Sequence, residues 1–126
     1  MFYFFRVRHR RRRRVAGNRK KYLQYRETAR VLAHALIARV NAHYNFTIGR
    51  VAIRNNRSRW GSCSRKYNLN FNYKIVFLPE RLAEYIVAHE LCHIGQFNHS
   101  RKFWDLVGEY VPDYSDCVRE LKKIRI

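Results

Sequence analysis

The sequence predicts an α+β fold in a single domain. Three observations predict it: a helical pattern near the N-terminus, short alternating segments in the middle of the chain, and helical patterns in the last third. With 126 residues, of which 47% are hydrophobic, the chain can form one modest core. We therefore expect a long N-terminal helix, a small, mostly antiparallel three-stranded sheet, a buried central helix and two C-terminal helices.

The first predicted helix runs from about residue 19 to residue 42. This stretch contains no Gly or Pro, and its apolar residues recur at helical spacing. Its first turns are basic, so we expect them to face solvent. Asn41, His43 and Asn45 are expected to end the helix.

Three short strands are predicted to follow. The first covers residues 46–54, and the second lies within residues 57–64 and enters a turn. In the third, Leu69, Phe71 and Tyr73 alternate with asparagines, which predicts a half-buried strand with one polar face. Because tight turns separate the three segments, we expect a mostly antiparallel sheet.

Helical patterns fill the rest of the chain. Pro79 suits the first turn of a helix that runs to about Ile94. This helix is apolar on nearly every side, so it is predicted to be buried. A short helix from Ser100 to Tyr110 and a last helix starting at Pro112 complete the domain.

Residues 1–18 are interpreted as a basic leader and residues 19–126 as the domain. The chain has a net charge of +18, and residues 1–30 carry twelve Lys and Arg against one acid. Such a block attracts nucleic acid or an anionic membrane by releasing counterions. We expect the leader to contact nucleic acid or the ribosome; the alternative is a solvated tail without a partner. The arginines in its centre are Arg10, Arg11, Arg12, Arg13 and Arg14.

The compartment follows from the apolar segments and the cysteines. No apolar stretch approaches the roughly 20 residues of a membrane span, and the apolar N-terminal residues are too few for a signal-peptide core. We therefore expect a cytoplasmic protein. Its three cysteines, Cys63, Cys92 and Cys117, lack paired Cys-x-x-Cys spacing and are predicted to be free thiols. The sequence leaves the oligomeric state open.

The pattern His89-Glu90-x-x-His93 lies in the predicted buried helix. Two histidines four residues apart project from one helix face, so a single metal ion can accept both. Glu90, next to the first histidine, is then close enough to take a proton from metal-bound water. The alternative is a helix whose histidines only pack or form hydrogen bonds. Burial argues against it, because these polar groups are costly to desolvate without partners.

A third metal ligand is expected at His99. A continuous helix would carry His99 to another face, but Gly95 and Asn98 tolerate left-handed backbone and are expected to end the helix. Ser100 then offers an N-cap for a new helix beginning near Arg101. A turn there would fold His99 back toward the pair and leave one coordination position open.

Two carboxylates are alternatives for the third ligand. Glu109 lies on the following predicted helix, as a third ligand does in thermolysin-like enzymes. Asp105 is a weaker alternative. From the residues alone we favour His99 over both.

Several segments together resemble the YgjP-like metallopeptidase family, which is related to the SprT-like and WLM zinc proteases. The resemblance covers roughly residues 25–126. It implies a zincin-like fold with one Zn²⁺ bound by His89, His93 and His99, and with Glu90 as the catalytic base. The segments that carry it are Arg59-Trp60-Gly61-Ser62-Cys63-Ser64, Leu78-Pro79, Val87-Ala88-His89-Glu90-Leu91-Cys92-His93, Asn98-His99-Ser100, Phe103-Trp104 and Pro112-Asp113-Tyr114.

We therefore expect a zinc-dependent hydrolase, a metallopeptidase that cleaves a protein or peptide substrate. Tyr114, Tyr110 and Arg59 are candidates for stabilising the oxyanion; the alternative for Arg59 is a structural role in closing the sheet onto the helix. An extended peptide can add to an exposed sheet edge, and the strand with Asn70 and Asn72 is the expected edge.

Two other classes of function stay open at this point. One is a metal-dependent nucleotide phosphohydrolase, whose basic surface would attract the nucleotide. The other is a nucleic-acid-associated module with a structural zinc. A structural site would need a closed set of four ligands, and no fourth Cys or His stands at suitable spacing in this segment.

Overall fold

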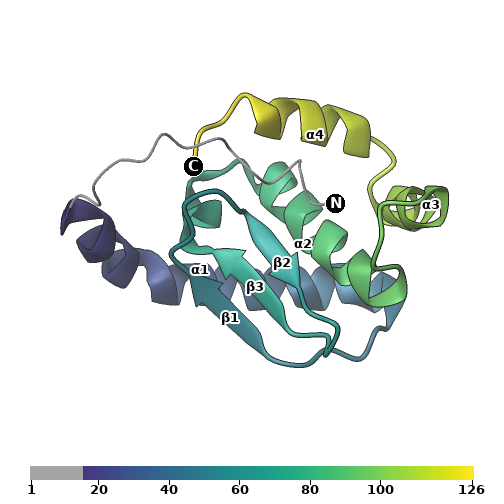
Figure 1. The fold of residues 1–126 in the computed structure, drawn as a ribbon, viewed down its shortest axis with the longest axis horizontal. Helices are drawn as coiled ribbons and strands as arrows, with labels where there is room; N and C mark the ends of the chain where they lie inside the picture. The colour runs from purple at the N-terminus through teal and green to yellow at the C-terminus, as the bar shows by residue number, and fades with distance from the viewer. Residues whose placement is uncertain (1–15) are drawn as a thin grey trace.

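The computed structural model describes residues 16–126, so the predicted contact residues Arg10–Arg14 lie outside the described part. Figure 1 shows the sheet in front of α1 and α2, with α3 and α4 beyond α2. This arrangement is the predicted α+β architecture. The elements are α1 (Ala16–Tyr44), β1 (Val51–Arg54), β2 (Gly61–Cys63), β3 (Leu69–Asn72), the 3-10 helix η2 (Tyr73–Phe77), α2 (Glu80–Gly95), α3 (Arg101–Tyr110) and α4 (Tyr114–Lys122).

Helix α1 begins at Ala16, three residues before its predicted start, and therefore includes the last residues of the predicted leader. Its buried positions, Ala29, Ala33, Leu36, Ile37 and Val40, follow helical spacing and form a single stripe. The stripe packs against α2 and η2.

Across residues 16–126, no helix combines the length and the apolar character needed to cross a membrane.

The sheet is mixed and has the strand order β1-β3-β2. Strand β2 pairs antiparallel with β3, as predicted, with Gly61 opposite Phe71. Strand β1 pairs parallel with β3, with Val51 beside Leu69, so the expectation of a mostly antiparallel sheet is wrong for this pair. A tight turn joins only β2 and β3. The connection after β1 leads to β2 at the other edge, and β3 then pairs between the two strands.

Strand β3 is central, and this corrects the expectation that the strand with Asn70 and Asn72 is an exposed edge. The strand also ends before Tyr73, which lies in η2. Buried Asn72 causes the change of direction: its Oδ1 accepts a hydrogen bond from the backbone N of Lys74 at 3.0 Å. Its amide nitrogen donates to the carbonyl oxygen of Asn56 at 2.9 Å. The two edge strands are β1 and β2.

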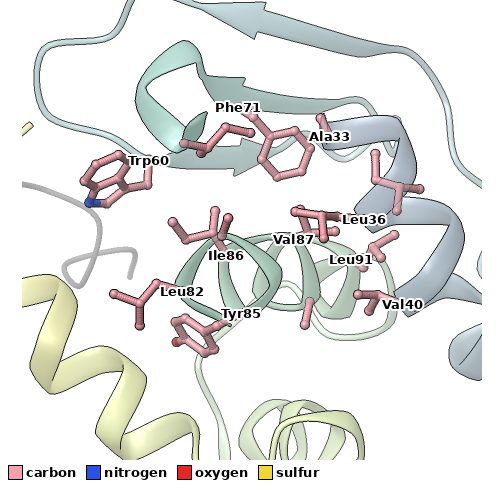
Figure 2. Close-up of a cluster of buried hydrophobic side chains, with 14 of the residues drawn as sticks. Ala33, Leu36, Val40, Trp60, Phe71, Leu82, Tyr85, Ile86, Val87 and Leu91 are labelled. Atoms are coloured by element: carbon pink, nitrogen blue, oxygen red, sulfur yellow. The ribbon is translucent and has the colours of Figure 1, made fainter. Parts of the chain in front are cut away.

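The core lies between the sheet and helices α1 and α2. Figure 2 shows Phe71 of the sheet above side chains of α2, with the buried stripe of α1 beside them. Helix α2 is buried along most of its length, as predicted, so its polar residues lie in an apolar environment. The largest fully buried side chains are Trp60, Tyr73, Tyr85, Phe71, Phe103, Leu36, Leu69, Ile75, Leu82, Ile86 and Leu91.

Helices α3 and α4 pack against α2. The predicted N-cap of α3 is confirmed, because Ser100 Oγ accepts a hydrogen bond from the backbone N of Phe103 at 3.4 Å. Arg81 of α2 forms ion pairs with Asp113 at 3.3 Å and with Glu120, which ties α4 to α2. Cys63, Cys92 and Cys117 are free thiols, as predicted.

Candidate metal centre

Three histidine side chains converge beside α2. Nε2 of His93 lies 3.1 Å from Nε2 of His89 and 3.1 Å from Nε2 of His99. The remaining pair, His99 and His89, is 3.2 Å apart at the same atoms. His89 and His93 come from successive turns of α2, and His99 comes from the loop before α3. The structure thus brings together the three histidines that the sequence singled out.

The donor set fits one divalent transition-metal ion. Three neutral imidazoles that point their lone pairs at one place repel each other unless they share a cation. A tetrahedral zinc ion with Zn–N bonds of about 2.0–2.1 Å places its ligand atoms about 3.3 Å apart. The observed separations of 3.1–3.2 Å lie close to this value. Imidazole nitrogen also suits zinc, whereas magnesium and calcium prefer oxygen ligands.

The end of α2 carries His99 back to the other two histidines. Gln96, directly after the helix, has extended backbone (φ −146°, ψ 106°). Neither Gly95 nor Asn98 has a positive φ, so the expectation that left-handed backbone ends the helix there is wrong. Gly95 instead lies in close packing, because a Cβ atom at this position would lie 3.0 Å from the Leu106 side chain and 3.1 Å from the Phe46 ring.

Hydrogen bonds to the second ring nitrogen orient two of the imidazoles. Nδ1 of His93 lies 3.0 Å from the carbonyl oxygen of Gln96, to which it donates. Nδ1 of His89 lies 3.1 Å from the hydroxyl oxygen of Tyr85. With Nδ1 as the donor, Nε2 keeps its lone pair for a metal ion. Sequence reasoning missed Tyr85, although its position four residues before His89 was an available signal.

Burial keeps the three histidines neutral. Desolvation lowers the pKa of His93 and of His99 to about 4 and lowers the pKa of His89 well below its ordinary value. Aromatic rings supply much of this environment: Phe103 stacks on His93 at 4.3 Å and Trp104 stacks on His99 at 5.8 Å between ring centroids. At neutral pH the cluster is therefore in its metal-binding form.

Glu90 directly follows His89 in α2 and is fully buried. Among the described residues, neither carboxyl oxygen has a hydrogen-bond partner. Burial raises the pKa of Glu90 to about 8, and the positive charge of Arg59 opposes this shift. A buried carboxyl without a partner is costly, which makes it a candidate for a functional group.

Gly61 of β2 lies directly against Glu90. A Cβ atom at position 61 would be 3.0 Å from Cγ of Glu90 and 3.1 Å from the carbonyl oxygen of Asn70. The edge strand can therefore approach the carboxyl only because residue 61 lacks a side chain. Sequence reasoning assigned no role to Gly61; the only signal was its place in the Trp60-Gly61-Ser62 segment.

The predicted oxyanion donors lie in different surroundings. The ring of Tyr114 stacks on Trp104 at 5.0 Å, and Trp104 in turn stacks on His99. Arg59 is close enough to Glu90 for its charge to act on the carboxyl. The hydroxyl of Tyr110 donates to Glu84 at 3.4 Å, so this hydroxyl has a partner outside the histidine cluster.

The alternative third ligands are both exposed and paired elsewhere. Glu109 lies 3.1 Å from Nε2 of His43 on α1. Asp105 forms an ion pair with Arg101 at 3.4 Å. Within residues 16–126, neither belongs to the group of side chains that could hold a metal ion, which consists of the three histidines.

An open depression of about 530 Å³ lies between α3 and α4. Trp104, whose ring stacks on His99, forms part of its wall. Its remaining lining residues are Arg101, Asp105, Tyr114, Ser115 and Val118.

Comparisons with known proteins agree with this geometry. No curated protein sequence matches the chain. The crystal structure of the metallopeptidase zymogen abylysin from Pyrococcus abyssi is similar in fold, with a TM-score of 0.61 and 22% sequence identity over 72% of this chain and 89% of that chain. The sequence model of the YgjP-like metallopeptidase domain matches residues 6–124. The chain therefore belongs to the YgjP-like metallopeptidase family.

Proposed function

We propose that the protein is a zinc-dependent peptidase in which His89, His93 and His99 bind the metal and Glu90 is the general base. One observation carries this proposal: three Nε2 atoms lie within 3.2 Å of one another, and the residue directly after His89 is a buried carboxyl without a hydrogen-bond partner among the described residues. Membership of a metallopeptidase family supports a metal-dependent peptidase. The identity of the metal and the role of each residue are our own inference from the donor set.

The chain's contribution to metal binding begins with the neutral imidazoles. Their Nε2 atoms would hold the ion, while Tyr85 and the carbonyl of Gln96 fix the ring orientations through Nδ1. When bound, zinc supplies Lewis-acid activation of a water molecule and of the substrate carbonyl. The low pKa values of His93 and His99 mean that protons compete weakly for these ligands above about pH 5.

Glu90 would move the proton. Its carboxylate accepts a proton from the attacking water and returns it to the leaving amine. A pKa near neutral pH suits both steps, and burial raises the pKa of Glu90 to about 8. The surrounding core excludes bulk water from the carboxyl, which strengthens its interactions with the reacting groups.

The edge strand β2 is the proposed binding site for the substrate backbone. Gly61 places β2 against Glu90, and β2 pairs with β3 on one side only in the described sheet. An extended peptide that adds to the other side would pass next to the carboxyl. This inference keeps strand addition, which the sequence suggested, but moves it from β3 to β2.

The depression beside Trp104 is the proposed site for a substrate side chain. Trp104, Tyr114 and Val118 give it apolar walls, and the charge of Arg101 is compensated by Asp105. A large apolar side chain therefore fits it better than a charged one.

Of the three candidate oxyanion donors, we retain Tyr114 and Arg59, because the hydroxyl of Tyr110 is bonded to Glu84.

A structural zinc module is less consistent with this geometry. A structural site is closed by four protein ligands. In the described part of the chain, the candidate group contains three histidines and no fourth ligand. The adjacent carboxyl of Glu90 is also unnecessary for a structural site.

The test compares the zinc-loaded wild type with Glu90→Gln on a mixture of denatured proteins, with new N-termini counted by amine labelling. We expect cleavage by the wild type, a loss of about a thousandfold or more in the variant, and equal zinc content in both. Glu109→Gln is the matched control, because it makes the same change at an exposed residue. Undiminished cleavage by Glu90→Gln would contradict the role of Glu90. Release of phosphate from nucleotides, with no peptide cleavage, would contradict the peptidase assignment.

A further inference from the structure

Charge is distributed unevenly along the described fold. Residues 45–79, which form the sheet, its loops and η2, contain seven Lys and Arg and no acidic residue. All nine acids of the chain lie elsewhere, at Glu27 and between Glu80 and Glu120. The basic residues of the sheet segment are Arg50, Arg54, Arg57, Arg59, Arg65, Lys66 and Lys74.

The ion pairs of the described residues lie on the helical side of the molecule. Arginines of α1 and α2, such as Arg39 and Arg81, are neutralised by carboxylates. By contrast, Arg50, Arg54 and Arg65 form no ion pair within residues 16–126. The charges of these three arginines on the sheet side are therefore not compensated by an ion pair with any described acid.

The strand alternation places small and polar residues on the outer face of the sheet. Ile53 and Phe71 point into the core, so Ala52, Arg54 and Asn70 point outward. Asn72, the other neighbour of Phe71, is buried instead, because its amide donates to the loop carbonyl oxygens of Asn56 and Arg59. Hydrogen bonds confirm this order across the strands: Nε of Arg54 donates to Asn70 at 3.0 Å, and the Asn70 amide donates to Ser62 at 3.3 Å. We call these positions the outer sheet face: Arg50, Ala52 and Arg54, with Ser62, Ser64 and Asn70.

No described helix covers this face. Helices α1 and α2 pack against the sheet from the core side, and Figure 1 shows the three strands in front of them. Arg50, Arg54 and Ser64 are exposed, and the central positions Ala52, Ser62 and Asn70 are partly exposed. By strand geometry Arg50, which directly precedes β1, and Arg54, at the end of β1, are about 13 Å apart.

We propose that the outer sheet face binds the phosphodiester backbone of a nucleic acid without reading its sequence. Arg, Ser and Asn side chains are the groups that contact phosphate and sugar in nucleic-acid complexes. The excess charge supplies affinity through counterion release, and Ala52, at the centre of β1, leaves room for a backbone to approach. This activity is separate from the proposed peptidase function, because no outer-face residue is a candidate metal ligand or base.

The chemistry of the face favours nucleic acid over two other anionic partners. A protein interface is normally centred on a buried aromatic or aliphatic anchor, and this face has none. A membrane-surface site combines basic residues with apolar side chains that enter the bilayer, and the face has only Ala52. Amides and hydroxyls between arginines match a row of phosphates.

The test measures binding of the full-length protein to two fluorescein-labelled probes, a mixed-sequence 20-nucleotide DNA strand and the corresponding duplex, by anisotropy from 50 to 300 mM salt. The first variant is Arg50→Ala/Arg54→Ala. We expect it to weaken binding about tenfold and to reduce the slope of log K against log salt by about one for each arginine removed. The second is Asn70→Asp, which keeps the shape of the side chain and places a negative charge in the centre of the face. This variant should weaken binding similarly. The protein should stay folded, because an aspartate at position 70 can still accept the hydrogen bond from Arg54.

The matched control is Lys102→Ala/Lys123→Ala, which removes the same charge from exposed positions on the helical side. We expect it to change affinity less than about twofold. An equal loss in the control would overturn the proposal, as would binding by Asn70→Asp at wild-type strength. Displacement of the probe by polyglutamate as effectively as by unlabelled DNA would assign the face to acidic proteins instead. No binding by the wild type at 50 mM salt would also overturn the proposal.

Discussion

The α-carbon of Gly61 lies so close to Glu90 that a Cβ atom at position 61 would sit 3.2 Å from Oε2 of the carboxyl and 3.0 Å from its Cγ. A methyl group at position 61 would therefore fit only if the strand or the carboxyl moved by a few tenths of an ångström. The same strand is the proposed substrate site, so Gly61 sets how near a peptide backbone can come to the proposed base.

Gly61→Ala is expected to reduce peptide cleavage by about 10- to 100-fold, because displacing a reacting group by a fraction of an ångström is costly. Overpacking should also lower the free energy of unfolding by about 1–3 kcal/mol. Zinc content should be unchanged, since Gly61 supports none of the three histidines. The measurements are kcat/KM, urea unfolding and metal analysis of the same preparation.

The control for that substitution is Gly108→Ala in α3. A Cβ atom there would meet the Tyr114 ring at 3.5 Å, an ordinary contact. Alanine in a helix interior is favoured over glycine, so this variant should be as stable as the wild type or more stable by about 0.5–1 kcal/mol. Equal loss of activity in both variants would argue that Gly61 has no special relation to Glu90.

Tyr85→Phe is expected to weaken zinc binding by about 10- to 100-fold, because it removes the partner of His89 Nδ1 and leaves the ring less well oriented. Competition with a chromophoric chelator measures the affinity. Tyr73→Phe is the control: its buried hydroxyl has no hydrogen-bond partner among the described residues, so its removal should leave zinc affinity unchanged. Wild-type zinc affinity in the Tyr85→Phe protein would show that Tyr85 does not support metal binding by His89.

His99→Ala should weaken zinc binding by more than the roughly 100-fold that loss of an outer partner costs, since it deletes a direct ligand. Glu109→Ala should have no effect, because Glu109 is paired with His43. The same chelator competition decides between them. If the two results were exchanged, the third ligand would be Glu109, as the sequence alone allowed.

Glu90→Gln is expected to stabilise the metal-free protein at alkaline pH. Burial raises the folded-state pKa of Glu90 from 4.5 to about 8. Between these values the unfolded chain loses the proton and the folded protein keeps it, so this contribution to stability falls as pH rises and is fully lost above about pH 8. Glutamine cannot ionise and avoids the loss, which is on the order of a few kcal/mol.

Urea unfolding in the presence of a chelator, at pH 5 to 9, measures this difference. The histidines make the free energy of unfolding fall at acid pH, which is the opposite pH dependence. Both proteins contain the same histidines, so the difference between them at each pH cancels this contribution. The advantage of Glu90→Gln should be small near pH 5 and reach a plateau above pH 8. A difference that does not change with pH would mean that Glu90 titrates near its ordinary value in the folded protein.

Patterns of neighbouring residues in the sequence predicted the helices and predicted that the three histidines lie close together. The spacing of His89 and His93 alone places them on one helix face, and Ser100 could be recognised as an N-cap before α3. These features depend on a few neighbouring residues. The reason for the helix end was wrong, because extended Gln96 turns the chain and Gly95 serves close packing.

Features that depend on distant segments were not predictable in the same way. Alternation identified β3 as a strand, but it did not reveal that β3 enters between β1 and β2. Strand order is set by which apolar faces meet α1 and α2, and no local pattern encodes that choice. The contact between Gly61 and Glu90 has the same origin, since it joins residues 29 positions apart through the packing of β2 on α2.

The most direct test is metal analysis of the purified protein combined with X-ray absorption at the zinc edge. We predict one zinc ion per chain, coordinated by three imidazole nitrogens at about 2.0–2.1 Å and by one oxygen donor, with all coordination lost in the His93→Ala protein. A protein that retains no metal after zinc addition, or a spectrum showing four protein ligands with sulfur among them, would contradict the proposed metal centre.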